Sequence, residues 1–372
     1  MDTMNNSSYK SPYDNVFTEQ EKQLMYIVYV FITFFGVTSN LAVCYVILKY
    51  RHLRVIVNIL ILNLAVSDIV ACLSVYPFVF IDTKTTGLKG TSANILCGVT
   101  EGLSVFFIVA TVSLLTLSVL SMSRYIVINH PLRLNWRLKK GSIKYIFTII
   151  WITSAALLVP SSVSFKYDEK RQFCFREWAP GIHSFTYFIF TGLLGFFSPI
   201  FSLTFTYFTS VYTLWCKRSS VPNTSYSGSS QPNGNISVKK RVSILLGLLI
   251  VVYLLCWMPF AIYWLLSAGL GYYDGSDAKQ IKGIRFNRFT VFIALSNTIL
   301  NPIVYAFTNV HLRTAFWNCV TCRKLNSVGQ RLSMTGGPIP ISYVAQRRHT
   351  IHPGSIGIEL KTMGGRPREL TL

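Results

Sequence analysis

The sequence has few charged residues, and few of those are acidic. Charged side chains make up 13% of its 372 residues and hydrophobic ones 51%, and 35 Lys and Arg oppose 14 Asp and Glu, for a net charge of +21. So little charge excludes an ordinary soluble protein unless the apolar residues are concentrated in separate runs. No nucleophile, metal-binding triad or phosphate loop is arranged along the chain, so we predict that it is not an enzyme. Residues 1–23 have no apolar core, which argues against a cleavable signal peptide.

Long apolar runs are the dominant feature. Seven of them are long enough to cross about 30 Å of hydrocarbon. They are Leu24–Leu48, Val55–Ile81, Leu103–Ile128, Ile143–Val163, Phe185–Trp215, Val242–Ala268 and Phe289–Phe307. We expect an all-α membrane protein: a seven-transmembrane helix bundle at 24–309 after an extracellular segment, 1–23. A short amphipathic eighth helix at 310–323 and a disordered cytoplasmic tail, 324–372, would follow.

Basic residues distinguish the two sides of this bundle. The first, third and fifth connections carry Lys and Arg without any Asp or Glu, and the tail adds more basic residues. The positive-inside rule makes this side cytoplasmic and the N-terminus extracellular. An anionic inner leaflet or an acidic cytoplasmic partner explains the pI of 9.7 better than nucleic acid does. We expect a multi-pass protein of the plasma membrane.

Every apolar run carries polar or proline residues at a characteristic place. Asn301-Pro302-x-x-Tyr305 is the clearest case, because hydrocarbon offers no water to replace the backbone donor that proline removes. The others, in chain order, are Asn40, Leu64–Asp68, Ser123-Arg124-Tyr125, Trp151 with Pro160, Pro199 with Tyr207, and Cys256-Trp257-Met258-Pro259-Phe260. Together they resemble the rhodopsin-like (class A) G-protein-coupled receptors, most of all the peptide-receptor branch.

The resemblance implies roles for several of these residues. Activation of a heterotrimeric G protein would follow an outward swing of the sixth helix, bent at Trp257 and Pro259. The residues implied in G-protein coupling are Arg124, Tyr125, Tyr207 and Tyr305. Those implied in an allosteric sodium site, the one cofactor or metal that we expect, are Asp68, Ser113, Asn297 and Asn301. The alternative for Asp68 is a protonated aspartate in a structural polar network.

Two features depart from the family pattern. Ser123 replaces the acid that precedes the arginine, and Lys239 occupies a position that often carries glutamate, so the restraint on Arg124 in the inactive state should be weak. Cys97 precedes Arg124 by 27 residues, two more than the family norm. Cys97 and Cys174 are nevertheless the cysteines at outer positions, where an oxidising exterior favours a disulfide.

The residues expected near the extracellular opening of the helix bundle indicate the class of ligand. The aspartate of amine receptors is replaced by Phe106 and the lysine of opsins by Leu295, which disfavours both classes. An extracellular peptide, which we expect to be a neuropeptide, suits charged and aromatic side chains. The candidate ligand residues are Glu101, Phe106, Phe107, Trp257, Phe260, Tyr263, Trp264, Arg285 and Arg288. Alternatively, these side chains only solvate the loops, or the ligand is a small non-amine molecule such as a lipid or nucleotide. A transporter is the alternative class of protein, although the sequence has no internal repeat that supports it.

Further expectations concern modification and partners. Asn5 and Asn6 begin glycosylation sequons on the outer side. Cys319 and Cys322 suit palmitoylation beside the membrane better than zinc, because no second ligand pair accompanies them. Arrestin and receptor kinases are the further cytoplasmic partners that the resemblance implies.

Overall fold

The computed structural model describes residues 16–81, 86–169, 173–178, 184–215, 233–269, 277–308, 313–317 and 321. All of them belong to one compact unit, Met1–Lys324. Within this part of the chain, seven helical segments are long and apolar enough to cross a membrane. The predicted seven-helix bundle is therefore confirmed.

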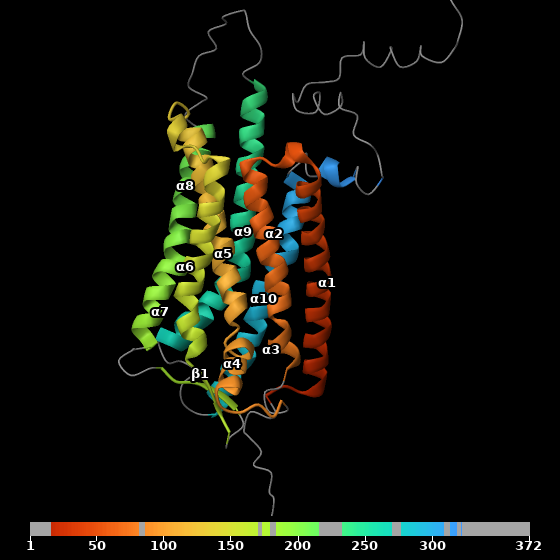
Figure 1. Ribbon diagram of the computed structural model, residues 1–372, viewed down its shortest axis with the longest axis vertical. Helices are drawn as coiled ribbons and strands as arrows, with labels where there is room; N and C mark the ends of the chain where they lie inside the picture. The colour runs from red at the N-terminus through yellow and green to blue at the C-terminus, as the bar shows by residue number, and fades with distance from the viewer. Residues whose placement is uncertain are drawn as a thin grey trace, which may run out of the picture. The chain divides into compact units, whose positions relative to one another are not determined.

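The helices run side by side along the long axis of the bundle (Figure 1). The first four spans are formed by α1 (Glu19–Lys49), α2 (Ile56–Ser74) with α3 (Tyr76–Phe80), α5 (Ser104–Asn129), and α6 (Ile143–Val163). The last three are α7 (Ser184–Gly192) joined to α8 (Ser198–Trp215) by a π-helical turn, then α9 (Asn233–Gly269) and α10 (Asp277–Thr308). A short helix, α4 (Gly90–Thr100), precedes α5, and the strands β1 (Phe165–Asp168) and β2 (Phe173–Arg176) form an antiparallel hairpin between α6 and α7.

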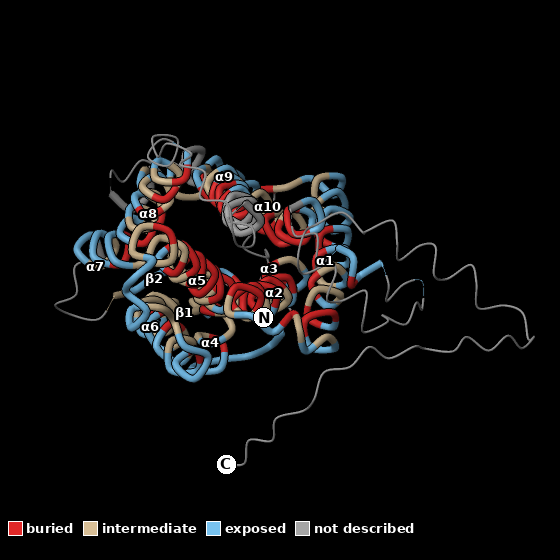
Figure 2. Tube along the Cα trace, turned by 90° about the horizontal axis from the view of Figure 1, so that it is seen from above, coloured by how far each residue is buried: buried red, intermediate tan, exposed pale blue. Residues whose placement is uncertain are grey.

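The distribution of side chains is that of a bundle immersed in hydrocarbon. Polar residues such as Asn40 (0% exposed) and Asp68 (2%) are buried between helices, whereas Phe201 and Phe307 are about three-quarters exposed, at 74% and 76%. Buried residues line the interior in Figure 2, most densely on α2 and α5, and α7 lies at the periphery. Lipid solvates apolar side chains well, so the polar groups are the ones that must find partners inside.

Helix ends differ from the predicted spans where polar residues continue a helix beyond the hydrocarbon. α1 begins at Glu19, five residues before the predicted Leu24, behind a capping box in which Thr18 and Glu21 bond each other's backbone N–H. α10 begins at Asp277, twelve residues before the predicted Phe289. Because helix propensity does not require apolar side chains, hydropathy locates the membrane crossing and not the helix end.

The hairpin and α4 lie at the same end of the bundle, below called the hairpin end (Figure 1). Cys97 of α4 forms a disulfide with Cys174 of β2, as predicted, with 5.6 Å between their Cα atoms. The N-terminus of α9 lies at the opposite end. Of the predicted eighth helix, the structure describes helical residues only at 313–317, and the rest of that segment lies outside the described residues.

Candidate functional site

A series of aromatic rings in stacked, tilted and edge-to-face contact, below called the ring stack, runs from the hairpin end toward the centre of the bundle. Phe106 of α5 and Trp257 of α9 are stacked with 5.5 Å between ring centroids. Phe260 lies 6.1 Å from Trp257, and Phe107 and Tyr263 lie 4.8 and 6.2 Å from Phe260. Phe106 and Trp257 are only 1% and 6% exposed, so they form the floor of the stack. The structure thus brings five candidate ligand residues together.

The two candidate arginines of α10 are both paired at the hairpin end. Arg285 forms an ion pair with Glu21 of α1. Arg288 has a nitrogen 3.6 Å from Glu101, and it donates a 2.7 Å hydrogen bond to the carbonyl oxygen of Phe78, whose ring it also covers at 3.8 Å. Both arginines therefore tie α10 to neighbouring helices, and each has a carboxylate to balance its charge.

Trp264, another candidate ligand residue, packs on α7. Its ring meets that of Phe188 edge to face, with centroids 5.5 Å apart. Gly192, one turn further along α7, permits this approach, because a Cβ there would lie 2.8 Å from the Trp264 ring. Any larger residue at Gly192 would push the α9 end away from α7.

The two extra residues before Arg124 are absorbed by a break between α4 and α5. Leu103 has a φ of 45°, in the left-handed region, although its side chain is 1% exposed. That conformation costs a non-glycine residue on the order of 1 kcal/mol, so packing and the disulfide of Cys97 must hold it in place. The break turns α4 so that Cys97 meets β2, and Glu101 lies within it.

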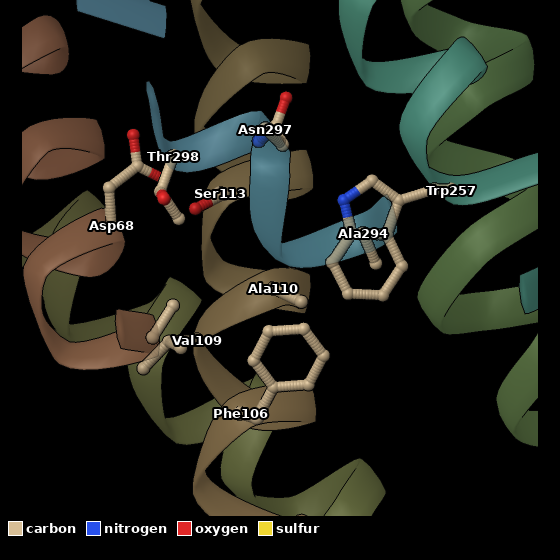
Figure 3. Close-up of a pocket in the computed structure, with 10 residues that line it drawn as sticks. Asp68, Phe106, Val109, Ala110, Ser113, Trp257, Ala294, Asn297 and Thr298 are labelled. Atoms are coloured by element: carbon tan, nitrogen blue, oxygen red, sulfur yellow. The ribbon is translucent and has the colours of Figure 1, made fainter. Parts of the chain in front are cut away.

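A small polar cavity lies beside the aromatic floor (Figure 3). Its volume is about 10 Å³, and its polar lining residues are Asp68, Ser113, Asn297 and Thr298. Asn301 donates a 2.8 Å hydrogen bond to the carboxylate of Asp68 and so belongs to the same cluster. The structure thus gathers all four residues predicted for the sodium site.

These groups fit a small monovalent cation. Carboxylate, hydroxyl and amide oxygens are ligands that hard cations prefer, and Asp68 supplies the negative charge. The side-chain oxygen of Asn297 is buried and lacks a hydrogen-bond partner among the described residues, so a cation would satisfy it. The volume matches the smallest space, about 10–15 Å³, that admits a water-sized particle. Asp68, Ser113 and Asn297 would hold the ion, and Asn301 would orient the carboxylate.

Thr298 is a member of this cluster that sequence reasoning missed. Its hydroxyl lies 3.3 Å from the sulfur of Cys72, and its carbonyl oxygen accepts a 2.8 Å hydrogen bond from the side chain of Asn40. The signal was its position three residues before Asn301, since residues at i and i+3 share one face of a helix.

Arg124 lies partly buried near the opposite end of the bundle. Its Nε atom is buried without a hydrogen-bond partner in the part of the chain that the structure describes. Ser123 beside it is 9% exposed. Tyr125 packs edge to face on His130, with centroids 5.5 Å apart, and so is held on the α5 side of the next loop. An arginine without a local acid is what the replacement of the usual acid by Ser123 predicts.

The two tyrosines that are predicted to take part in G-protein coupling differ in their surroundings. Tyr305 is 1% exposed, and its hydroxyl lacks a partner among the described residues. Tyr207 is partly buried, and its hydroxyl reaches the space where a Cβ of Gly247 would lie. The side chain of Lys239 lies outside the described residues, as do Asn5, Asn6, Cys319 and Cys322.

Arg176 of β2 is a charged residue of the hairpin end that sequence reasoning also missed. Its guanidinium lies 4.6 Å from the ring centre of Phe165, 5.2 Å from that of Phe188 and 5.8 Å from that of Trp178. The side chain is accessible to solvent, yet the surrounding protein lowers its pKa to about 10 by desolvation. The sequence feature that could have identified Arg176 is its position two residues after Cys174, because side chains at i and i+2 lie on the same face of a strand.

Comparison with known proteins assigns the class of this site and fold. Residues 39–305 match the family model "7 transmembrane receptor (rhodopsin family)". The chain therefore belongs to this family of receptors, and the resemblance seen in its motifs is confirmed. It is a multi-pass membrane receptor and not an enzyme, because the family consists of signalling receptors.

Individual relatives are distant. The chain is 25% identical to 5-hydroxytryptamine receptor 7 of Xenopus laevis over 357 residues, 86% of this chain and 81% of that protein. It is 27% identical to somatostatin receptor type 4 of Rattus norvegicus, covering 81% and 74% of the two chains. The tachykinin-like peptides receptor 86C of Drosophila melanogaster is 24% identical, with 82% and 60% covered. The names of these relatives include amine and peptide ligands.

Proposed function

We propose that the protein is a plasma-membrane receptor that binds an extracellular peptide, expected to be a neuropeptide, and activates heterotrimeric G proteins. Two of the relatives above are named for peptides, somatostatin and tachykinin-like peptides. One is named for an amine, 5-hydroxytryptamine. An amine ligand is disfavoured here because Phe106 stands where the family's amine receptors carry aspartate, and a phenyl ring supplies no counter-charge.

The observation that carries the proposal is the unbroken stack of rings from the hairpin end to Trp257. Tyr263 contacts Phe260, and Phe260 contacts both Phe107 and Trp257. A peptide seated at the hairpin end would press on the outer rings, and a packed stack transmits displacement because it cannot be compressed. Pro259 lies within this part of α9 and marks its point of bending.

A cation bound in the polar cavity would influence the same movement of α9. Trp257 and Asp68 line one cavity, so a shift of the ring changes the space beside the carboxylate (Figure 3). A bound sodium ion would supply a positive charge that stabilises the ionised aspartate in the resting arrangement. Ser113 and Asn297 would orient oxygen atoms toward it, and outward movement of α9 would follow once Trp257 has shifted.

Topology supports the orientation and the cytoplasmic partners. The disulfide between Cys97 and Cys174 belongs to an oxidising compartment, which favours an extracellular hairpin end. The basic loops at the opposite end suit the cytoplasm and an acidic G-protein surface. Arrestin and receptor kinases are proposed as further partners at that end.

The polar cavity itself cannot hold a lipid or nucleotide. The cavity beneath Phe106 and Trp257 has a volume of about 10 Å³. Pockets for drug-sized ligands are typically about 300–1,000 Å³. A ligand of either kind would have to bind above the stacked rings, at the hairpin end, as is proposed for a peptide.

The test is guanine-nucleotide exchange in membranes of cells that express the receptor, measured against a panel of neuropeptides. We expect at least one peptide to stimulate exchange, and Phe260→Ala to reduce its potency about tenfold, since an aromatic contact and its buried area are lost. Ile262→Ala is the matched control, because Ile262 lies on the same helix and is 49% exposed. Equal potency for Phe260→Ala and the control would exclude the ring stack as the route of activation.

A further inference from the structure

Arg176 differs from the other described arginines of the hairpin end in having no carboxylate. Arg285 is paired with Glu21 and Arg288 with Glu101. The side chain of Arg176 makes neither an ion pair nor a hydrogen bond with any residue in the described ranges of the chain, and its contacts are with aromatic rings. Because no described carboxylate neutralises this solvent-accessible guanidinium, it can pair with an anion that arrives from outside.

The hairpin directs Arg176 toward the bundle. Along β2 the side chains alternate between faces, so Arg176 lies on the face of Cys174, which is bonded to Cys97 of α4. Phe165 of β1 is the register partner of Arg176 and lies on that face as well. The disulfide therefore fixes which face of the hairpin turns inward.

Aromatic rings hold the guanidinium in position. Those of Phe165, Phe188 and Trp178 lie 4.6 to 5.8 Å from its central carbon. The rings support one another: Trp178 lies 5.5 Å from Phe188 and 4.8 Å from Tyr187. Such contacts restrict the long side chain and reduce the entropy lost when a ligand binds.

The N–H groups of the arginine stay available in this setting. Ring faces attract the guanidinium charge but do not accept its in-plane N–H bonds as a carboxylate does. The side chain is accessible to solvent, and with a pKa of about 10 it is charged at neutral pH. Two parallel N–H donors match the two oxygens of a carboxylate, which is the reason that arginine binds this group so well.

We propose that Arg176 binds a carboxylate of the extracellular ligand, either the C-terminal carboxylate of a peptide or an Asp or Glu side chain. The site adjoins the predicted ligand residues, because Phe188 also contacts Trp264. This assignment rests on the proposed function only in its choice of a peptide. It also adds a reason why amines are disfavoured, since an ammonium group would be repelled by Arg176 and find no acid at Phe106.

A first experiment tests the carboxylate site without any known agonist. The full-length receptor in lipid nanodiscs is exposed to 3-phenylpropionate and, separately, to 3-phenylpropionamide, and binding is read by saturation-transfer NMR. We expect about tenfold weaker binding of the amide, the loss expected for a charge-assisted hydrogen bond. Arg176→Gln should abolish the preference and Arg176→Lys should keep part of it.

Lys166→Gln is the matched control for this experiment. Lys166 pairs in register with Phe175 and so lies on the other face of the same hairpin, which means that the variant removes an equal charge from a different place. It should keep the preference of the wild type. Equal binding of acid and amide to the wild type, or a preference that survives Arg176→Gln, would overturn the proposal.

A second experiment distinguishes the source of the carboxylate. Pools of hexapeptides are made with a free C-terminus or a C-terminal amide, and with Asp and Glu present or replaced by Asn and Gln, and nucleotide exchange is measured. A preference for the free C-terminus assigns the main-chain carboxylate, and one for the acidic pools assigns a side chain. If pools with and without carboxylates act equally on the wild type, the proposal is overturned. If every pool fails while 3-phenylpropionate still requires Arg176, the carboxylate site stands and the peptide part of the proposed function is wrong.

Discussion

Replacing Ser123 by aspartate tests how firmly Arg124 is restrained in the resting bundle. The Nε atom of Arg124 is buried without a partner among the described residues, and Ser123 is 9% exposed. A hydrogen bond to a charged group contributes about 1.5–3 kcal/mol, and desolvation of the new carboxylate offsets part of that gain. A net stabilisation of the closed state by about 1 kcal/mol would change the ratio of closed to open receptor about fivefold.

The assay is ligand-independent nucleotide exchange at matched surface expression. We expect measurable exchange for the wild type, because Ser123 gives Arg124 no carboxylate. Ser123→Asp should lower that exchange about fivefold. Ser123→Asn is the control, because it has nearly the same shape as aspartate without the charge, and it should leave exchange unchanged. Arg124→Ala should reduce basal and ligand-driven exchange alike if this arginine contacts the G protein.

Two results would refute the reasoning. Negligible exchange by the wild type would show that other contacts keep the bundle closed without an acid at Ser123. Equal exchange by Ser123→Asp and Ser123→Asn would show that the charge of the new side chain does not reach Arg124.

Three further predictions follow from the other parts of the site. Cys97→Ser and Cys174→Ser should each reduce surface expression or peptide response to the same extent, and the double variant should be no worse; a single variant that behaves as wild type would contradict this. Asp68→Asn should abolish the effect of sodium on ligand binding, compared with a larger monovalent cation at equal ionic strength, and an unchanged sodium effect would leave Asp68 a structural residue. Phe106→Ala should lower the free energy of unfolding by about 3–5 kcal/mol and the partly buried Phe107→Ala by less, measured by thermal unfolding, and equal losses would mean that Phe106 is not the packed floor.

The membrane crossings could be predicted because one physical requirement determines them. A helix that crosses hydrocarbon needs about 20 mostly apolar residues, and this sequence presents that pattern seven times. The start of α10 could not be predicted in the same way. Its first turns, from Asp277, contain charged residues such as Lys282. A hydropathy profile detects apolar residues only, so it cannot show where a polar helical segment begins.

The candidate site was predictable where burial leaves few choices. A carboxylate such as Asp68 inside hydrocarbon needs polar neighbours, so the polar residues of adjacent spans had to converge on it. The aromatic surroundings of Arg176 depend instead on the contact of β2 with Phe188 of α7, which is set by tertiary packing. No local pattern encodes such contacts, and the left-handed conformation of Leu103 has no reliable sequence signal either.

The break at Leu103 limits how positions may be equated between this receptor and its relatives. A continuous helix turns about 100° per residue, so two extra residues would rotate everything before them by about 200°. The helix is interrupted at Leu103, and this break lets Cys97 reach Cys174 and form the disulfide. From Ser104 to Arg124, α5 is continuous, so residue positions counted back from Arg124 are not shifted by the two extra residues. Alignments anchored on Arg124 are therefore sound from Ser104 onward, whereas those that cover α4 need a gap of two residues. Without that gap, a ligand contact known for a relative would be assigned to the wrong side of α4.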